Sequence, residues 1–296
     1  KAIKETGNEL IVAMDINDSV GILDEYFPKA EFFKTFEEFT SYIKQFVKHQ
    51  KIDYLVVCSP NHLHFSHIKF ALENKINVIC EKPLVLIPNE LDKLQYYEKL
   101  YGAKVYSILQ LRLHPSILSL LQKVKEASVD KIFEVNLTYI TSRGKWYFKS
   151  WKGFDEKSGG IATNIGVHFY DILYFIFGKV KKNEVYYRDK MTSSGYLEYE
   201  RAKVRWFLSI NSSFLPPKYI QNENKTFRSI EIEGEVVDFS LGFEDLHTVS
   251  YKKILEGNGY KIEDNRVAIN TVSKIRDLPL KIKTDFLHPY FKKLSI

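Results

Sequence analysis

The sequence is poor in the residues that mark several classes of protein. Its 296 residues include two cysteines, 14 glycines and nine prolines, which excludes a disulfide framework, a collagen-like repeat and a low-complexity array. Cys58 and Cys80 each lie in an apolar run, where a free thiol packs as a small hydrophobic residue. We therefore expect a packed globular protein in a reducing compartment, the cytoplasm.

The sequence also lacks a clear targeting or membrane-spanning segment. Residues 1–8 are polar, so we expect no signal peptide. The longest apolar stretch, Ile161 to Phe177, approaches the length of a membrane span but includes Asn164, His168 and Asp171. These polar side chains argue against a span, and we expect no membrane contact.

Length and charge divide the chain in two. It is about twice as long as a typical domain, which predicts domains over residues 1–110 and 111–296. The formal net charge is +6, but residues 1–110 carry 13 basic and 15 acidic side chains, whereas residues 111–296 carry 30 and 22, a net of +8. A basic second half suits nucleic acid, an anionic membrane surface or a small anionic ligand, and charge alone does not choose among them.

The pattern of apolar residues predicts the fold class. In the first domain, apolar runs alternate with helical segments; the runs are residues 9–15, 51–59, 76–80 and 104–109. This α/β alternation predicts a Rossmann-type parallel sheet with helices on both faces. From about residue 130, longer alternating segments predict a C-terminal α+β domain with a large, open, mostly antiparallel sheet. Helices are expected at 161–177 and 264–276.

Asp15 ends the first apolar run. In a dinucleotide-binding βαβ unit, an acid at the end of the second strand binds the adenosine ribose and favours NAD over NADP. A solvated carboxylate in a turn is the alternative. The glycine-rich loop that belongs about 20 residues upstream is not in the sequence. We therefore expect a Rossmann sheet whose first strand and glycine loop are missing.

Polar residues follow the second apolar run. Ser59 and Asn61 stand where open α/β sheets bind ligands, although either could simply cap a helix. Three nearby histidines, His62, His64 and His67, suggest a metal site. However, 62 and 64 point to different sides of a helix and no acid or thiol completes a ligand set, so we expect no metal.

Lys82 follows the third apolar run in the sequence Glu81-Lys82-Pro83. Because Pro83 restricts Lys82 to extended geometry, the ammonium group is aimed from the ligand-binding edge of the sheet. An isolated lysine is usually solvated. Partial desolvation at this edge would instead lower its pKa enough for proton transfer.

Three polar residues, Asn164, His168 and Asp171, are spaced to share one stripe of an otherwise apolar helix. The stripe indicates either a core histidine satisfied by Asp171 or the wall of a site. Basic and aromatic residues, among them Arg143 and Lys152, interleave over residues 142–153. Such a segment could stack bases of single-stranded nucleic acid or bind the phosphate, carboxylate and base of a small nucleotide.

Glu81-Lys82-Pro83 and residues 158–171, Ser-Gly-Gly-Ile-Ala-Thr-Asn-Ile-Gly-Val-His-Phe-Tyr-Asp, together resemble the glucose-fructose oxidoreductase, inositol dehydrogenase and rhizopine catabolism (Gfo/Idh/MocA) family. The resemblance covers essentially the whole chain. It implies a Rossmann domain and a C-terminal α/β domain whose open sheet commonly forms an oligomer interface, hence a homo-oligomer. The segments most similar to UDP-N-acetyl-2-amino-2-deoxy-glucuronate 3-dehydrogenases of O-antigen synthesis are residues 151–153, 157–171 and 245–251, together with Gly257, Gly259 and residues 262–264.

The resemblance implies roles for individual residues. Lys82 and His168 match the family's catalytic pair, one acting as base and the other holding the developing oxyanion; we favour His168 as base because a neutral imidazole needs no large pKa shift. NAD would contact Asp15, Asn17, Ser59, Pro60, Asn61, His64, Glu81, Lys82, Gln110 and Trp151. The substrate, a UDP-sugar uronic acid, would contact Lys82, Arg143, Lys152, Asn164, His168 and Asp171.

Three other functions stay open from the sequence. The chain could be a dehydrogenase of the same family that acts on a free sugar or cyclitol. It could be a non-catalytic nucleotide-sugar binding protein, as the absent glycine loop suggests. A nucleic-acid binder is third, and it would show steep salt dependence. The leading interpretation needs no nucleic acid.

Overall fold

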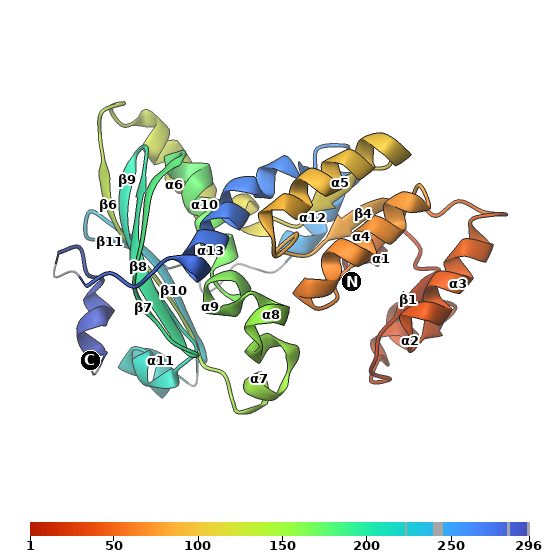
Figure 1. Cartoon of the computed structure of the whole chain (residues 1–296), viewed down its shortest axis with the longest axis horizontal. Helices are drawn as coiled ribbons and strands as arrows, with labels where there is room; N and C mark the ends of the chain where they lie inside the picture. The colour runs from red at the N-terminus through yellow and green to blue at the C-terminus, as the bar shows by residue number, and fades with distance from the viewer. Residues whose placement is uncertain (223, 239–244, 283–284, 295–296) are drawn as a thin grey trace.

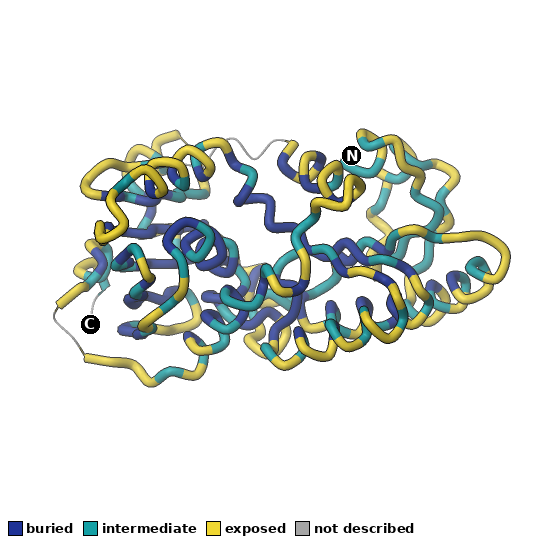
Figure 2. Tube along the Cα trace, turned by 90° about the horizontal axis from the view of Figure 1, so that it is seen from above, coloured by how far each residue is buried: buried dark blue, intermediate teal, exposed yellow. Residues whose placement is uncertain are grey.

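The computed structural model describes residues 1–222, 224–238, 245–282 and 285–294, and Figure 1 shows two regions side by side along the long axis. An N-terminal α/β region lies at one end and a larger sheet with its helices at the other. In Figure 2, buried trace concentrates in the second region and at the junction. None of residues 1–38 is buried. The main hydrophobic core therefore begins with Phe39.

The N-terminal region contains the predicted parallel strands. Its elements are α1 (Ala2–Glu5), β1 (Val12–Met14), α2 (Ile22–Tyr26), β2 (Glu31–Phe33), α3 (Phe36–Phe46), β3 (Tyr54–Val57), η1 (Asn61–Leu63), α4 (His64–Glu73), β4 (Asn77–Cys80), α5 (Pro88–Tyr101), β5 (Val105–Ser107) and η2 (Gln110–Leu113). β3, β4 and β5 pair in parallel, as expected. The runs that form them are short; β3 and β5 bury alternate residues, whereas the last three residues of β4 are all buried.

The expected single sheet is divided. β1 pairs only with β2, in a separate two-stranded parallel sheet, and no ladder between described residues joins β1 to β3. In the 3-2-1-4-5 strand order of a Rossmann sheet, the place between the second and fourth strands belongs to the strand that precedes the glycine-rich turn. No strand among the described residues occupies that place.

The chain returns to the N-terminal sheet near its end. α12 (Leu246–Leu255) packs against η2 and α1, and β12 (Tyr260–Lys261) pairs antiparallel with β5. A single cut between residues 110 and 111 therefore leaves one strand of this sheet in the second half of the chain. The domain boundary stays a prediction.

The second region is built on a six-stranded sheet in the order β11-β10-β6-β9-β8-β7. Its strands are β6 (Phe133–Thr141), β7 (Val180–Arg188), β8 (Thr192–Tyr199), β9 (Ala202–Ser209), β10 (Thr226–Ile232) and β11 (Glu235–Asp238). β6 and β9 are parallel and every other neighbouring pair is antiparallel. This confirms the predicted large, mostly antiparallel sheet.

Both faces of this sheet are covered to some degree. The remaining helices and turns are α6 (Pro115–Glu126), α7 (Trp146–Lys149), η3 (Trp151–Gly153), α8 (Asp155–Ser158), α9 (Gly160–Asn164), α10 (Val167–Phe177), η4 (Ser212–Phe214), α11 (Pro217–Gln221), η5 (Glu263–Asn265), α13 (Arg266–Asp277) and η6 (Pro289–Lys293). α10 packs on one face, where Tyr170 meets Trp206 edge-on. On the other face, His288 contacts Thr138 and stacks on Phe207. The C-terminal segment therefore covers part of a face expected to be open.

The expected single helix over 161–177 was wrong, because the structure has two helices with a break between them. α9 and α10 meet at Gly166, where an added Cβ would lie 2.4 Å from the Ala162 carbonyl oxygen and 2.6 Å from the Leu208 side chain. Only glycine fits this close approach to the sheet. Among the described residues, no single helix is long and apolar enough to cross a membrane; residues 155–164 and 167–177 meet those criteria only as a pair bent by 44°.

Candidate active site

A pocket of about 250 Å³ opens where β3 and β4 end and α10 begins. It is lined by Cys58, Ser59, Asn61, His64, Glu81, Lys82, Tyr139, Arg143, Tyr147, Trp151, Lys152, Asn164, Ile165 and His168. The carboxyl ends of parallel strands are the usual ligand-binding edge of an α/β sheet. The second region closes the pocket from the opposite side, so both regions contribute to one site.

Most of the predicted site residues meet in this pocket. Those that line it are Ser59, Asn61, His64, Glu81, Lys82, Arg143, Trp151, Lys152, Asn164 and His168. The structure places Asp15, Asn17, Pro60, Gln110 and Asp171 outside its lining. The roles of all these residues stay predictions.

Lys82 and His168 face the pocket from different regions of the chain. Lys82 is the second residue after β4 and is joined to Pro83 by a cis peptide bond. Burial lowers the pKa of Lys82 to about 8. The charge of Glu81 raises this pKa, whereas the charges of Lys152 and other cations lower it further. Burial and the Lys82 charge hold the pKa of His168 well below its usual value. At neutral pH, the structure therefore holds a neutral imidazole beside an ammonium group.

The side chains of Asn61 and His64, which follow β3, contact backbone carbonyls instead of capping a helix. Asn61 Nδ2 donates to the Ser158 carbonyl at 2.9 Å, which ties the ligand-binding edge to α8. The His64 ring nitrogens lie 2.8 Å from the carbonyls of Pro83 and Ser59. No side-chain cap is formed at the start of η1 or α4. The capping alternative is therefore wrong, and His64 connects the ends of two neighbouring strands.

The basic and aromatic segment forms the pocket's outer wall. The Lys152 ammonium lies 5.5 Å from the Trp146 ring centroid and 5.6 Å from that of Trp151, within cation–π range of both. Trp146 is 51% exposed. Burial and the charge of Arg143 lower the pKa of Lys152. The segment thus presents positive charge and an aromatic face at the mouth of the pocket.

Tyr147 in the same segment was missed by sequence reasoning. Its hydroxyl accepts a hydrogen bond from Asn164 Nδ2 at 2.8 Å. This contact orients the amide of Asn164 from α9.

Two further residues were missed. Arg228 on β10 lies close enough for its charge to lower the pKa of both Lys82 and His168, and no sequence signal marked it because strand pairing brings it there.

His247 was the other omission. Its Nε2 lies 3.0 Å from Glu81 Oε1. Burial alone would raise the pKa of Glu81, but the His247 hydrogen bond and the Lys82 charge lower it, while the hydrogen bond to Glu81 raises the pKa of His247. The motif over residues 245–251 was the available signal, but it had been assigned no contact.

The expected substrate contact of Asp171 is corrected by its surroundings. Arg112 Nη2 and Nε donate to its two carboxylate oxygens at 2.7 and 2.9 Å, and both side chains are buried. Because the break at Gly166 separates the two helices, Asp171 is not part of one continuous polar stripe with Asn164. Asp171 secures Arg112 instead of facing the pocket.

The remaining predicted cofactor residues lie around the N-terminal sheet. Asp15 directly follows β1, and its Oδ1 accepts hydrogen bonds from the Asn17 backbone N–H at 2.8 Å and from Asn17 Nδ2 at 3.2 Å. Gln110 begins η2 and is buried, and its Oε1 has no hydrogen-bond partner among the described residues. An acceptor left in this state suits an amide donor of a ligand.

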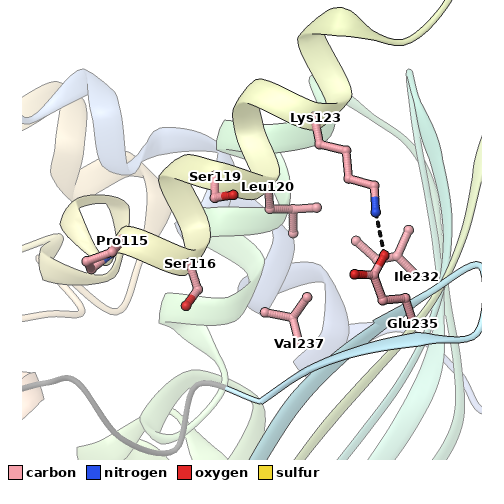
Figure 3. A pocket seen from close by; sticks show the side chains of 8 residues that line it. All are labelled: Pro115, Ser116, Ser119, Leu120, Lys123, Ile232, Glu235 and Val237. Carbon is pink, nitrogen blue, oxygen red and sulfur yellow. Dashed lines mark hydrogen bonds and ion pairs between the residues drawn. The ribbon is translucent and has the colours of Figure 1, made fainter.

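A second, larger hollow of about 380 Å³ lies between α6 and β10–β11 (Figure 3). Lys123 reaches across it to form an ion pair with Glu235, and Ser116 and Ser119 line its α6 side. Nothing in this lining matches a catalytic pair. Among the described residues, no three histidine, cysteine, aspartate or glutamate side chains gather as metal ligands would.

The fold and the site match a family of oxidoreductases with an NAD-binding domain. Residues 2–108 match the model described as "Oxidoreductase family, NAD-binding Rossmann fold", and residues 122–222 match "Oxidoreductase family, C-terminal alpha/beta domain". The chain belongs to this family, the Gfo/Idh/MocA oxidoreductases.

Among solved structures, the chain is similar to the WlbA (WbpB) dehydrogenase from Thermus thermophilus in complex with NAD and UDP-GlcNAcA. The two are 44% identical with a TM-score of 0.94, and the match covers 98% of this chain and 94% of that one. The WlbA dehydrogenase from Bordetella pertussis shares the fold at 18% identity and a TM-score of 0.75, over 95% and 93% of the two chains.

Curated relatives match over shorter segments. The D-glucoside 3-dehydrogenase of Escherichia coli (strain K12) is 26% identical over 132 residues, which are 43% of this chain and 36% of the relative. The chain thus spans about a third of the length of the curated relatives first matched.

Proposed function

We propose that the protein is an NAD-dependent dehydrogenase that oxidises the C3 hydroxyl of UDP-N-acetyl-2-amino-2-deoxy-glucuronate (UDP-GlcNAcA) to the 3-keto sugar nucleotide, in O-antigen sugar synthesis. The observation that carries the proposal is the 44% identity, over nearly both full lengths, with a dehydrogenase whose solved structure holds NAD and UDP-GlcNAcA. The pocket adds a lysine and a histidine with suitable protonation states.

The residues present fit NAD. The carboxylate of Asp15 stands at the end of a parallel strand, where it can accept from ribose hydroxyls. The buried Oε1 of Gln110 can accept from a carboxamide N–H. Ser59, Glu81 and Trp151, which are also predicted to contact NAD, line the pocket. When bound, NAD supplies the hydride acceptor.

Proton transfer falls to the chain's own side chains. Loss of hydride from a secondary alcohol requires loss of the hydroxyl proton as well. His168 is neutral at physiological pH, so its imidazole can accept that proton. Lys82 is mostly an ammonium below about pH 8, so it can stabilise the developing negative charge on oxygen. Asn164, oriented by Tyr147, is placed to bind a neighbouring hydroxyl or the acetamido group.

The charge of the pocket favours an anionic substrate. Lys82, Arg143 and Lys152 line it, whereas Glu81 is the only acid among the described residues of the lining and is already hydrogen-bonded to His247. A pyrophosphate and a uronate carboxylate complement this excess of positive charge. Trp146 has an exposed aromatic face on which the uracil ring of the substrate can stack. A compact pocket of about 250 Å³ suits one sugar better than a nucleic-acid strand.

NADH formation tests the proposal directly. Full-length protein with NAD should form NADH from UDP-GlcNAcA. UDP-GlcNAc, which carries a neutral hydroxymethyl group in place of the C6 carboxylate, should be oxidised much more slowly. A free glucoside and a cyclitol are the third arm, because part of the chain is similar to a D-glucoside 3-dehydrogenase. If only the uncharged sugars react, the substrate assignment is wrong. If NAD and UDP-GlcNAcA bind without turnover, the chain is a binding protein.

We also propose a homo-oligomer and a cytoplasmic location. The C-terminal sheet is the surface proposed for assembly, with the segment on its second face forming part of the contact. Size-exclusion chromatography with light scattering would measure the assembly. Two free thiols, Cys58 and Cys80, suit a reducing compartment, where UDP-sugars and NAD are made.

A further inference from the structure

His247 is the only described residue of α12 whose side chain is hydrogen-bonded to the end of β4. It lies 3.0 Å from Glu81, the neighbour of Lys82. Two separate contacts fix the same helix: Thr248 Oγ1 donates to Glu5 Oε2 at 2.6 Å, and Lys1 pairs with Asp245 at 2.9 Å. α12 is therefore held on the N-terminal region independently of His247. The contact of His247 with Glu81 is therefore not needed to hold α12 in place.

The consequence concerns Lys82. Within the part of the chain that the structure describes, Glu81 is the only acid in the pocket lining, and it precedes Lys82 in the chain. Its carboxylate attracts the ammonium group and opposes the effect of burial. A hydrogen bond from His247 draws Glu81 Oε1 towards α12 and places a second partially charged group beside it. Less of the negative charge of Glu81 is then available to Lys82.

We propose that His247 is a positioning residue, which binds Glu81 and so keeps that carboxylate from forming a full ion pair with the Lys82 ammonium. The proposal rests on the proposed function only in giving Lys82 a role in the reaction. Without His247, the Glu81 carboxylate would turn to the Lys82 ammonium and would hold the proton on it.

Several other charges act on the same ammonium and set the background for this effect. The groups that face Lys82 are Glu81 on its own strand end, His168 on α10, Arg143 and Lys152 on the segment after β6, and Arg228 on β10. All except Glu81 are cationic or neutral, so they disfavour the ammonium or leave it unchanged. Glu81 is the one group whose release can raise the proton affinity of Lys82 substantially.

The test is the titration of Lys82 itself, measured without substrate. In protein labelled with [ε-¹³C]lysine, the Lys82 signal is assigned by its loss in Lys82→Met, and its midpoint is followed by NMR. In His247→Ala we expect the midpoint to rise by about half a unit to one unit. His247→Gln, whose amide can still donate to Glu81, should raise it less. On a Glu81→Gln background, His247→Ala should leave it unchanged.

Thr248→Ala is the matched control, because it removes a contact of the same helix without touching Glu81. The proposal is overturned if His247→Ala leaves the midpoint where it is, or if Thr248→Ala moves it as far. With UDP-GlcNAcA and NAD, the limb of the kcat profile that belongs to Lys82 should move to higher pH in His247→Ala by the same amount. Absence of turnover in the wild type would contradict the proposed function and leave the NMR result to decide this one.

Discussion

Two charged clusters lie three residues apart on α10 and have opposite electrostatic designs. His168 faces a pocket in which Lys82, Lys152 and Arg143 are balanced by one carboxylate. Asp171 faces Arg112, whose guanidinium also donates to the Asp264 side chain at 3.2 Å and to its carbonyl at 3.0 Å. The cations of the first cluster outnumber its carboxylates, whereas each charge of the second cluster has a partner of opposite sign.

The difference separates binding from folding. Arg112 lies between the Phe175 and Tyr260 rings, 5.1 and 4.9 Å from their centroids, so three elements meet on one buried cation. Burial alone would lower the pKa of Arg112, but the two aspartates raise it. A closed network of this kind holds β12 and α10 to η2. The pocket keeps its excess positive charge available for a ligand, at a cost in stability that the rest of the fold must offset.

Removing Lys82 should give the largest effect on the open cluster. In Lys82→Met we expect kcat to fall by about 10³-fold, because both the oxyanion contact and the charge are lost. The free energy of unfolding should not fall, since a buried ammonium in cationic surroundings is removed. NADH formation and urea denaturation measure the two quantities. Retention of more than a tenth of the activity would show that Lys82 is not part of the chemistry.

Breaking the closed cluster should do the reverse. Asp171→Asn leaves Arg112 buried beside one remaining carboxylate, and we expect it to cost about 3–5 kcal/mol in the free energy of unfolding. Activity should persist where the protein is folded. The double variant Asp171→Leu with Arg112→Met is the control, since replacing both charges by apolar groups should cost less than the single change. Equal losses in single and double variants would mean that packing, not charge pairing, dominates.

The cation at the pocket's mouth should give an intermediate effect. Arg143→Gln removes a charge from the lining and should raise KM for UDP-GlcNAcA about tenfold, the equivalent of roughly 1.4 kcal/mol of binding. KM for NAD should change little. Lys145→Gln, an exposed neighbour outside the lining, is the matched control. If both variants raise KM equally, general attraction by the basic half of the chain accounts for the affinity.

Local pattern was enough to predict much of this contrast. Hydrophobic periodicity predicts four parallel strands in the first region and the mostly antiparallel sheet in the second. Lys82 was predicted at the ligand-binding edge because the ends of parallel strands define that edge. The side of α10 that each polar residue faces was not predictable in the same way. Spacing alone put Asn164 and Asp171 on one continuous stripe, because nothing local reveals the break at Gly166.

Residues brought in by distant segments were missed for a different reason. Arg228 reaches the pocket through pairing of β10 with β6, and His247 arrives on a helix that returns to the N-terminal region. Arg112 is hydrogen-bonded to Asp264, which lies 152 residues later in the sequence. Partners of this kind depend on strand order and helix docking, which a single sequence does not contain.

The smallest predicted effect concerns pH and decides what Lys82 does in the open cluster. If its ammonium stabilises the oxyanion, kcat should fall as the amine loses its proton through about pH 8, by about fourfold between pH 7 and 8.5. His168 should add no fall in this range, because its pKa lies well below 6.5 and it is already neutral. The sign reverses if Lys82 is the base: kcat would then rise over the same interval. Lys82→Arg separates the cases, since a guanidinium stays charged and should abolish the alkaline fall. Nothing comparable is expected of the closed cluster, where Arg112 keeps its proton and the Asp171 contact should stay insensitive to pH throughout this range.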